Sequence, residues 1–189
     1  MKIAIIPSIK EPYKKQFEYS ADIKLFKFVK VCFPTSEIIF LTKSNNLNKK
    51  YKLLIISGGN TILKFSRKKK NVIRNFIDEK FYNQAKKNNI PILGICHGAQ
   101  FLASKLGAKL TKKKDVGTHN IYLIEDKKTI KVNSYHNIII TKISQNTKIL
   151  ATSLDGSIEY FKNNKITGIQ WHPERYKNFK TFDKNLIKK

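Results

Sequence analysis

Cysteine is scarce in this sequence of 189 residues, which contains only Cys32 and Cys96. Two isolated cysteines provide neither a disulfide framework nor the paired spacing of a zinc site. We therefore expect no structural disulfide, no bound metal and no cofactor. Free cysteines are typical of the reducing cytoplasm, and we expect the protein to be located there.

Long hydrophobic runs are also missing. No stretch approaches the roughly 20 apolar residues that a membrane-spanning helix needs. The apolar run that starts at Lys2 is short and is interrupted by Pro7, unlike the core of a secretory signal peptide. The length suits one domain, residues 1–189, with its own hydrophobic core and no membrane partner.

Acidic residues are few: 13 Asp and Glu stand against 38 Lys and Arg, which gives a formal net charge of +25. Basic clusters lie at 64–70 and 109–115. Such a surface attracts anions, whether nucleic acid, acidic membrane or a phosphorylated substrate. Alternatively, the lysines reflect a genome rich in A/T codons, which Lys, Asn and Ile share. No nucleic-acid-binding motif is present, so we expect no nucleic-acid partner.

Apolar, β-rich runs alternate with longer segments in the first half of the chain. The runs are 2–7, 37–41, 52–57 and 90–95, and segments of helical length include 17–31 and 71–88. Nearly continuous apolar strands suit a parallel sheet that is covered on both faces. The pattern predicts an α/β fold of the flavodoxin-like, doubly wound type, with a mostly parallel sheet flanked by helices.

The character of the chain changes at about residue 118. Short strand-like runs follow one another, joined by turn sequences at 154–157 and 162–165. This half is expected to form antiparallel hairpins. From Tyr176 onward the sequence predicts a final lysine-rich helix.

One of the two cysteines follows an apolar strand and precedes a helix. Cys96 lies between Gly94 and Gly98, and the helix is expected to end at Gly107. Strand, sharp turn and helix form a nucleophile elbow, here with cysteine in place of serine. The partial positive charge of a helix N-terminus favours a thiolate, which is the reactive form. Cys96 is therefore a candidate nucleophile, although many free cysteines are simply small buried side chains.

A base and a carboxylate occur near the end of the last strand-like run. His172 precedes Pro173, which favours extended backbone at the histidine. In an extended segment His172 and Glu174 would point the same way. Together with Cys96 they predict a triad in which His172 transfers protons and Glu174 orients the imidazole.

A third motif, Ser57-Gly58-Gly59-Asn60, directly follows a predicted strand. Glycines let backbone amides approach a ligand closely. We expect the N–H groups of Gly59 and His97 to form an oxyanion hole. An ordinary tight turn is the alternative.

The three motifs together resemble the class I glutamine amidotransferase superfamily, and the resemblance spans nearly the whole chain. The segments 132–137 and 153–161 make the sequence more similar to the γ-glutamyl hydrolase branch. The resemblance implies a Cys-His-Glu triad and a γ-glutamyl thioester. It also implies that Gln100 and the backbone around Tyr135, His136 and Asn137 bind the glutamyl group. His119 and His136 are more readily explained as structural or substrate-shaping residues than as extra catalytic ones.

Three functions remain open at this stage. The first is a hydrolase of a small-molecule γ-glutamyl amide. A nucleotide-linked amide in capsule phosphoramidate synthesis fits the basic surface best, with the residues 67–70 near the mouth of the site. Polyamine, folate or peptide amides are alternatives. The second is a glutaminase subunit that delivers ammonia to a synthase partner, and the third is a non-enzymatic module on the same fold.

Overall fold

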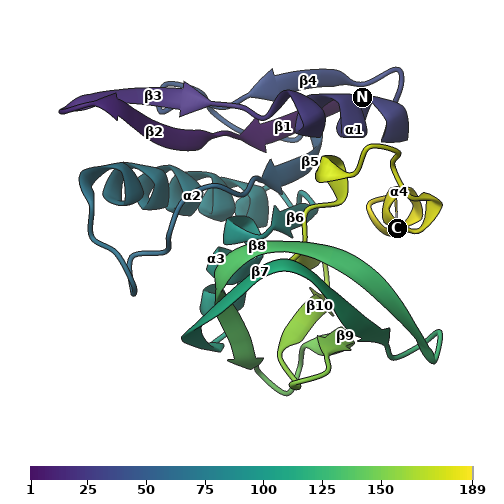
Figure 1. Ribbon diagram of the computed structural model, residues 1–189. Coiled ribbons are helices and arrows are strands. Elements are labelled where there is room, and N and C mark those ends of the chain that lie inside the picture. The colour runs from purple at the N-terminus through teal and green to yellow at the C-terminus, as the bar shows by residue number, and fades with distance from the viewer. Residues whose placement is uncertain (189) are drawn as a thin grey trace.

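The computed structural model describes residues 1–188, and for Asp115 the backbone alone. A nine-stranded sheet runs through the molecule, with a separate two-stranded hairpin beside it (Figure 1). The strands of the large sheet are β1 (Lys2–Ile6), β4 (Glu37–Phe40), β5 (Tyr51–Ile56), β6 (Ile92–Ile95), β7 (Lys109–Leu123), β8 (Lys128–Lys142), β9 (Lys148–Ser153), β10 (Ile158–Asn163) and β11 (Ile166–Ile169).

Five strands form the parallel half of this sheet, in the order β4-β1-β5-β6-β11. Numbered along the chain within that half, the order is the 2-1-3-4-5 arrangement of doubly wound flavodoxin-like proteins. The remaining strands, β10, β8, β7 and β9, are antiparallel and include the long arched hairpin β7–β8 (Figure 1). The predicted fold class and the antiparallel C-terminal half are confirmed.

Helices cover both faces of the parallel half. One hydrophobic cluster joins the sheet to α2 (Lys69–Lys87) and α3 (His97–Lys105). A second cluster joins the opposite face to α1 (Ile23–Cys32) and α4 (Thr181–Leu186). Alternate residues of β1 and β5 belong to the two clusters, as expected of strands that are buried on both faces.

The segment 17–31, which we expected to be helical, is helical only in its second part. Residues 8–20 form a hairpin of β2 (Ser8–Tyr13) and β3 (Gln16–Ser20), which turns at Lys15 with φ +66° (Figure 1). The helix starts after Asp22, whose carboxylate accepts a hydrogen bond from the Lys24 N–H. Such a side-chain cap fixes the start of a helix.

Over residues 176–188, the described part of the tail, the chain is α-helical only in the six residues of α4. Before it, η1 (Pro173–Arg175) forms a single turn of 3₁₀ helix. Lys180 directly precedes α4 and Asp183 lies in its first turn, and Leu186 and Ile187 anchor the helix in the second hydrophobic cluster. Within residues 1–188, every helix is too short or too polar to cross a lipid bilayer.

Candidate active site

Three neighbouring parallel strands deliver the three sequence motifs to one edge of the sheet. β5 is followed by Ser57, β6 by Cys96, and β11 by the segment that leads to His172. The strands are in register, with Ile56 opposite Gly94 and Ile95 opposite Ile169. The carboxyl ends of parallel strands are where doubly wound proteins place their binding sites.

The turn at Cys96 has the geometry of a nucleophile elbow. Cys96 has φ +52° and ψ −103°, a strained conformation for a residue with a side chain, and α3 begins at the next residue. A Cβ on Gly98 would lie 2.0 Å from the carbonyl oxygen of Ile56, and one on Gly94 would lie 2.5 Å from the Gly98 carbonyl. The glycines therefore allow α3 to approach the sheet closely enough to hold this turn.

The side chains of His172 and Glu174 lie in contact, as predicted, but the backbone conformation that brings them together differs from the predicted one. The Nδ1 of His172 lies 2.6 Å from the Oε1 of Glu174, and both side chains are buried. The backbone between them is not extended, because Pro173 starts the 3₁₀ turn η1. Proline suits the first position of a helical turn, where no backbone N–H is required. The turn, rather than strand alternation, brings the two side chains together.

The surroundings of His172 favour its charged form. Burial opposes charging and is the largest single influence, but the hydrogen bonds and negative charges that Cys96 and Glu174 contribute together outweigh it. The result raises the pKa of His172 to about 9. An imidazole in this state is prepared to donate a proton.

Two neighbours limit the movement of the His172 ring. A Cβ added to Gly58 would lie 2.7 Å from the Cε1 of His172, so the absence of a side chain at this position makes room for the ring. The Tyr135 ring meets His172 edge to face, with centroids 5.4 Å apart and an interplanar angle of 83°. The imidazole is thereby held between the Ser57–Asn60 loop and β8.

Asn133 positions the backbone of His172, a contact that no sequence motif indicated. Its side-chain oxygen accepts from the His172 N–H and its side-chain nitrogen donates to the His172 carbonyl, both at 2.8 Å. The Asn133 N–H in turn donates to the Tyr176 hydroxyl at 3.0 Å. Only its place in the segment 132–137 could have drawn attention to this residue.

A small cavity of about 160 Å³ lies beside the cysteine and the histidine. The cavity brings together Cys96 and His172 with five other residues for which we predicted a role or a position near the substrate, namely Gly59, Gln100, Tyr135, His136 and Asn137. Gln100 is buried, and its side-chain nitrogen donates to the Ile138 carbonyl at 3.2 Å. Glu174 does not line this cavity, but it contacts His172, which does.

The side chain of His97, for which we predicted only a backbone role, belongs to a buried charged network. Its Nε2 lies 2.8 Å from Asp78, whose other oxygen accepts from the Arg74 Nε at 2.8 Å. Arg74 also donates to the Ser57 carbonyl at 2.8 Å. Burial lowers the pKa of His97, and the positive charge of Arg74 lowers it further, so the ring is neutral and donates to Asp78. The network connects the start of α3, helix α2 and the loop that contains Gly59.

The other two histidines lie against a buried carboxylate. The Nε2 atoms of His119 and His136 lie 3.6 Å and 3.9 Å from the carboxylate oxygens of Glu159, which is fully buried. His136 also lines the small cavity, whereas His119 does not. Among the side chains that the structure describes, which exclude that of Asp115, no group of three or more His, Cys, Asp or Glu is arranged to hold a metal ion.

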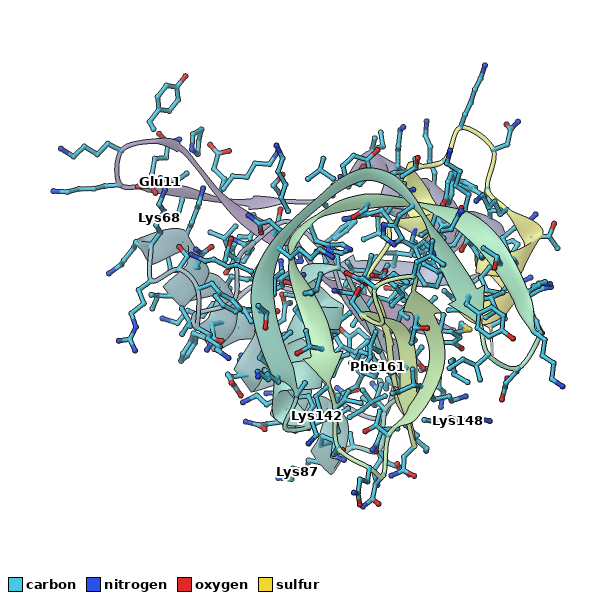
Figure 2. All side chains as sticks on the ribbon, turned by 60° about the horizontal axis from the view of Figure 1, so that its bottom comes forward. Glu11, Lys68, Lys87, Lys142, Lys148 and Phe161 are labelled. Carbon is cyan, nitrogen blue, oxygen red and sulfur yellow. The ribbon has the colours of Figure 1, made fainter. Side chains whose placement is uncertain are left out.

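A second cavity of about 380 Å³ adjoins the small one. Both are lined by Gly59, His172 and Arg175, and the larger one is also lined by Lys10 and Asp22. The cluster 67–70, which we expected near the mouth of the site, lines neither cavity. Figure 2 shows Lys68 at the start of α2, next to the β2–β3 hairpin.

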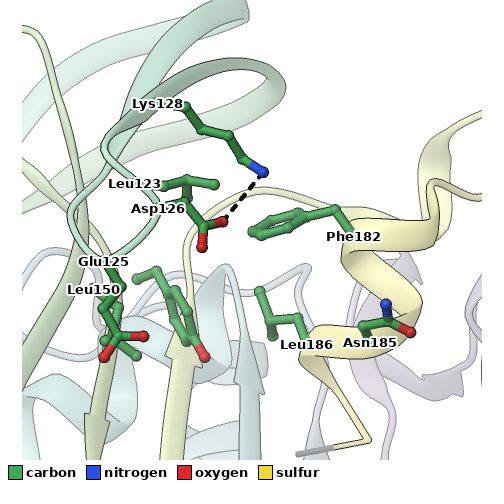
Figure 3. Close-up of a pocket in the computed structure, with 9 residues that line it drawn as sticks. Leu123, Glu125, Asp126, Lys128, Leu150, Phe182, Asn185 and Leu186 are labelled. Atoms are coloured by element: carbon green, nitrogen blue, oxygen red, sulfur yellow. Dashed lines mark ion pairs between the residues drawn. The ribbon is translucent and has the colours of Figure 1, made fainter.

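A third cavity, of about 390 Å³, lies between the β7–β8 turn and helix α4 (Figure 3). It contains none of the candidate catalytic residues. Its two carboxylates are paired with lysines, Asp126 with Lys128 at 3.3 Å and Glu125 with Lys148.

Comparison with known proteins places the chain in a family. The family model described as glutamine amidotransferase class-I matches residues 20–189. The chain belongs to this family, and the resemblance inferred from its motifs is confirmed.

Individual relatives agree with this membership. The chain is 32% identical over 127 residues to the γ-glutamyl-CDP-amidate hydrolase of Campylobacter jejuni, covering 66% of this chain and 62% of the relative. It is also 32% identical over 114 residues to one subunit of the glutamine-hydrolysing GMP synthase of Sulfolobus acidocaldarius, covering 53% of this chain and 60% of the relative. The matched region thus spans somewhat less than two thirds of the length of these curated relatives.

Solved structures share the fold. The fold matches a crystal structure from Thermoplasma acidophilum with a TM-score of 0.71 at 19% identity, and the match covers all of this chain and 90% of the Thermoplasma chain. A glutamine amidotransferase from Thermotoga maritima matches 92% of this chain and 76% of its own, with a TM-score of 0.68 at 19% identity.

Proposed function

We propose that the protein is an enzyme that hydrolyses a γ-glutamyl amide through a covalent bond to Cys96. The observation that carries this proposal is the arrangement of Cys96, His172 and Glu174 at one sheet edge, beside a cavity of about 160 Å³. A nucleophile, a base and an orienting carboxylate are the parts that acyl transfer requires. Membership of the glutamine amidotransferase family supports the same chemistry.

In the first step, the sulfur of Cys96 forms a bond to the γ-carbonyl carbon and the carbonyl oxygen becomes an oxyanion. The N–H of His97 is available to stabilise it, because the first N–H groups of a helix have no partner within the helix. The N–H of Gly59, on the adjacent loop, is the second proposed donor. The Arg74–Asp78–His97 network holds these two backbone segments together.

The carbon–nitrogen bond then breaks, and His172 gives its proton to the departing nitrogen. This leaves a γ-glutamyl thioester on Cys96. Water attacks the thioester while His172 accepts a proton, the carbon–sulfur bond breaks, and glutamate is released. Glu174 stabilises the charged imidazole through its 2.6 Å contact with Nδ1.

Gln100 and the β8 residues Tyr135, His136 and Asn137 are proposed to bind the glutamyl group. They line the cavity that contains Cys96. The hydrogen bond from Gln100 to the Ile138 carbonyl fixes its side chain against β8. A cavity of about 160 Å³ is large enough for a single amino-acid side chain and its α-groups.

The substrate that we favour is a γ-glutamyl amide of a cytidine nucleotide. The Campylobacter jejuni relative is named for this substrate, and the net charge of +25 favours an anion. A role in capsule phosphoramidate synthesis would follow from it. The alternative is a glutaminase subunit that supplies ammonia to a synthase, which the similarity to a GMP synthase subunit supports.

Release of glutamate from a panel of γ-glutamyl amides tests this function. We expect Cys96→Ala to abolish turnover and Cys96→Ser to leave little, because a hydroxyl is a much weaker nucleophile. Cys32→Ala is the control, since Cys32 is buried on α1 away from the site. Turnover by Cys96→Ala at the normal rate would refute the covalent mechanism. Activity on glutamine that appears only with an added synthase would favour the alternative.

A further inference from the structure

The second cavity is larger than the departure of ammonia requires. It measures about 380 Å³, more than twice the volume of the cavity that contains Cys96. Its walls come from the base of the β2–β3 hairpin, the start of α1, the loop after β5 and the segment from His172 to Arg175. The small cavity and the large one therefore meet at His172.

The position of His172 assigns a role to each cavity. The imidazole of His172 must reach the amide nitrogen of the leaving group in order to protonate it. The substituent on that nitrogen must therefore occupy a cavity that His172 lines. The glutamyl group occupies the small cavity under the proposed function. The larger cavity is then the space into which the rest of the leaving group extends.

We propose that this larger cavity is a leaving-group site for a diphosphate-bearing amine, with Lys10 and Arg175 as its cationic contacts. The inference rests on the proposed function and adds the residues that select the substrate. Lys10 is exposed and, within the described part of the chain, its side chain forms no ion pair or hydrogen bond. Its ammonium group is therefore available to an anion.

Arg175 is oriented at the boundary between the two cavities. Its guanidinium lies 4.6 Å from the centre of the Tyr135 ring, which holds it over the site. Its contacts with carboxylates are loose, at 3.7 Å to Asp22 and 3.9 Å to Glu174. Asp22 is already engaged as the cap of α1, and Glu174 binds His172. The planar donors of Arg175 suit phosphate oxygens.

The structure separates this site from the lysine clusters that the sequence suggested. Residues 67–70 line neither cavity, although they carry four positive charges. Lys14 provides a closer control than these residues. It is exposed at the turn of the same hairpin as Lys10, carries the same charge and lines neither cavity.

Steady-state kinetics of Lys10→Gln and Lys14→Gln test the proposal on two substrates, γ-glutamyl-CDP-amidate and glutamine. We expect Lys10→Gln to raise KM for the nucleotide amide by about tenfold, because the substrate loses one charge-assisted hydrogen bond. The value of kcat should change little. KM for glutamine should change by less than about twofold. Lys14→Gln should change KM for neither substrate by more than about twofold, because a surface charge that does not contact the substrate acts on it only at long range, where salt screens the interaction.

A binding measurement makes the test independent of catalysis. Calorimetric titration of CDP into Cys96→Ala should show binding that Lys10→Gln weakens by about tenfold and Lys14→Gln does not. Inorganic pyrophosphate should compete with CDP if the diphosphate is the recognised part. Equal CDP affinities for the Lys10 and Lys14 variants, or no CDP binding at all, would overturn the leaving-group site. If the wild type releases glutamate from no γ-glutamyl amide, the proposed function fails, whatever the result of the CDP titration.

Discussion

The burial of His172 and its contacts with Cys96 and Glu174 determine how the protonation of the site responds to pH. Because the folded protein raises the pKa of His172 from 6.5 to about 9, it binds this proton more tightly than the unfolded chain does. The contribution of His172 to stability is therefore fully present below pH 6.5 and is lost as the pH rises through about 9.

Titration of the His172 ring protons by nuclear magnetic resonance measures this effect. We expect a midpoint near pH 9 in the wild type and a lower midpoint in Cys96→Ala and Glu174→Gln, because each change removes a negative neighbour. A wild-type midpoint near 6.5 would show that Cys96 and Glu174 do not influence the ring.

Kinetics provide a second prediction for the same residues. His172→Ala should lower kcat by several orders of magnitude and Glu174→Ala by less, since the carboxylate acts through the imidazole. The double variant should be hardly slower than His172→Ala alone, because residues that act as a unit are not additive. If the loss of kcat in the double variant equals the product of the losses in the two single variants, Glu174 does not belong to the triad.

Gly58 is a third test at the level of single residues. In Gly58→Ala the new Cβ would lie 2.7 Å from the Cε1 of His172, so the ring has to move. We expect kcat to fall by about a hundredfold, the typical effect of a displacement of about 1 Å in a catalytic group. Circular dichroism should show an unchanged fold. Full activity would mean that the ring tolerates the shift.

At the level of elements, helices α2 and α3 and the loop after β5 are joined by one buried ion pair. Arg74 and Asp78 are completely buried, and His97 and the Ser57 carbonyl complete their contacts. The loss of one partner leaves the other charge buried without compensation, which typically costs about 3–5 kcal/mol.

Urea unfolding of Asp78→Asn measures this cost. We expect the free energy of unfolding to fall by about 3 kcal/mol, together with a loss of kcat, because the loop of Gly59 is no longer tied to α3. Asp126→Asn is the matched control. It removes a half-exposed carboxylate from its pair with Lys128 and should cost less than about 1 kcal/mol. Equal losses in the two variants would show that the buried pair contributes no more than a surface pair.

The same elements show what the sequence could and could not reveal. The continuous apolar runs of β1, β5 and β6 identify buried parallel strands, and the glycines around Cys96 identify the elbow. The β2–β3 hairpin was missed because its strands are short and mostly exposed, so they carry little apolar pattern. Arg74 and Asp78 resemble a surface i,i+4 pair, and only tertiary packing shows that they are buried.

At the scale of the whole molecule, the excess of lysine has a thermodynamic consequence. The chain of 189 residues has a formal net charge of +25. Its positive side chains repel one another most strongly in the compact folded state, where they are closest together. Salt shortens the range of this repulsion, to about 10 Å at 0.1 M and less at higher concentrations.

The midpoint of urea unfolding should therefore rise as sodium chloride increases from about 0.01 M to about 0.3 M. The same salt should raise KM for an anionic substrate, because it weakens long-range attraction, while a contact with Lys10 is screened less. A midpoint that is constant or falls with salt would mean that the positive charges are already compensated within the fold.

Trp171 is the only tryptophan of the chain. It is fully buried, donates from Nε1 to Asp183 at 2.9 Å, and directly precedes His172. Its fluorescence therefore has a single origin, and its emission should be that of an indole shielded from water. Undocking of α4 would break the bond to Asp183 and shift the emission to longer wavelengths. Ligand binding beside His172 is expected to change its intensity. The protein thus contains an intrinsic optical probe that needs no added label.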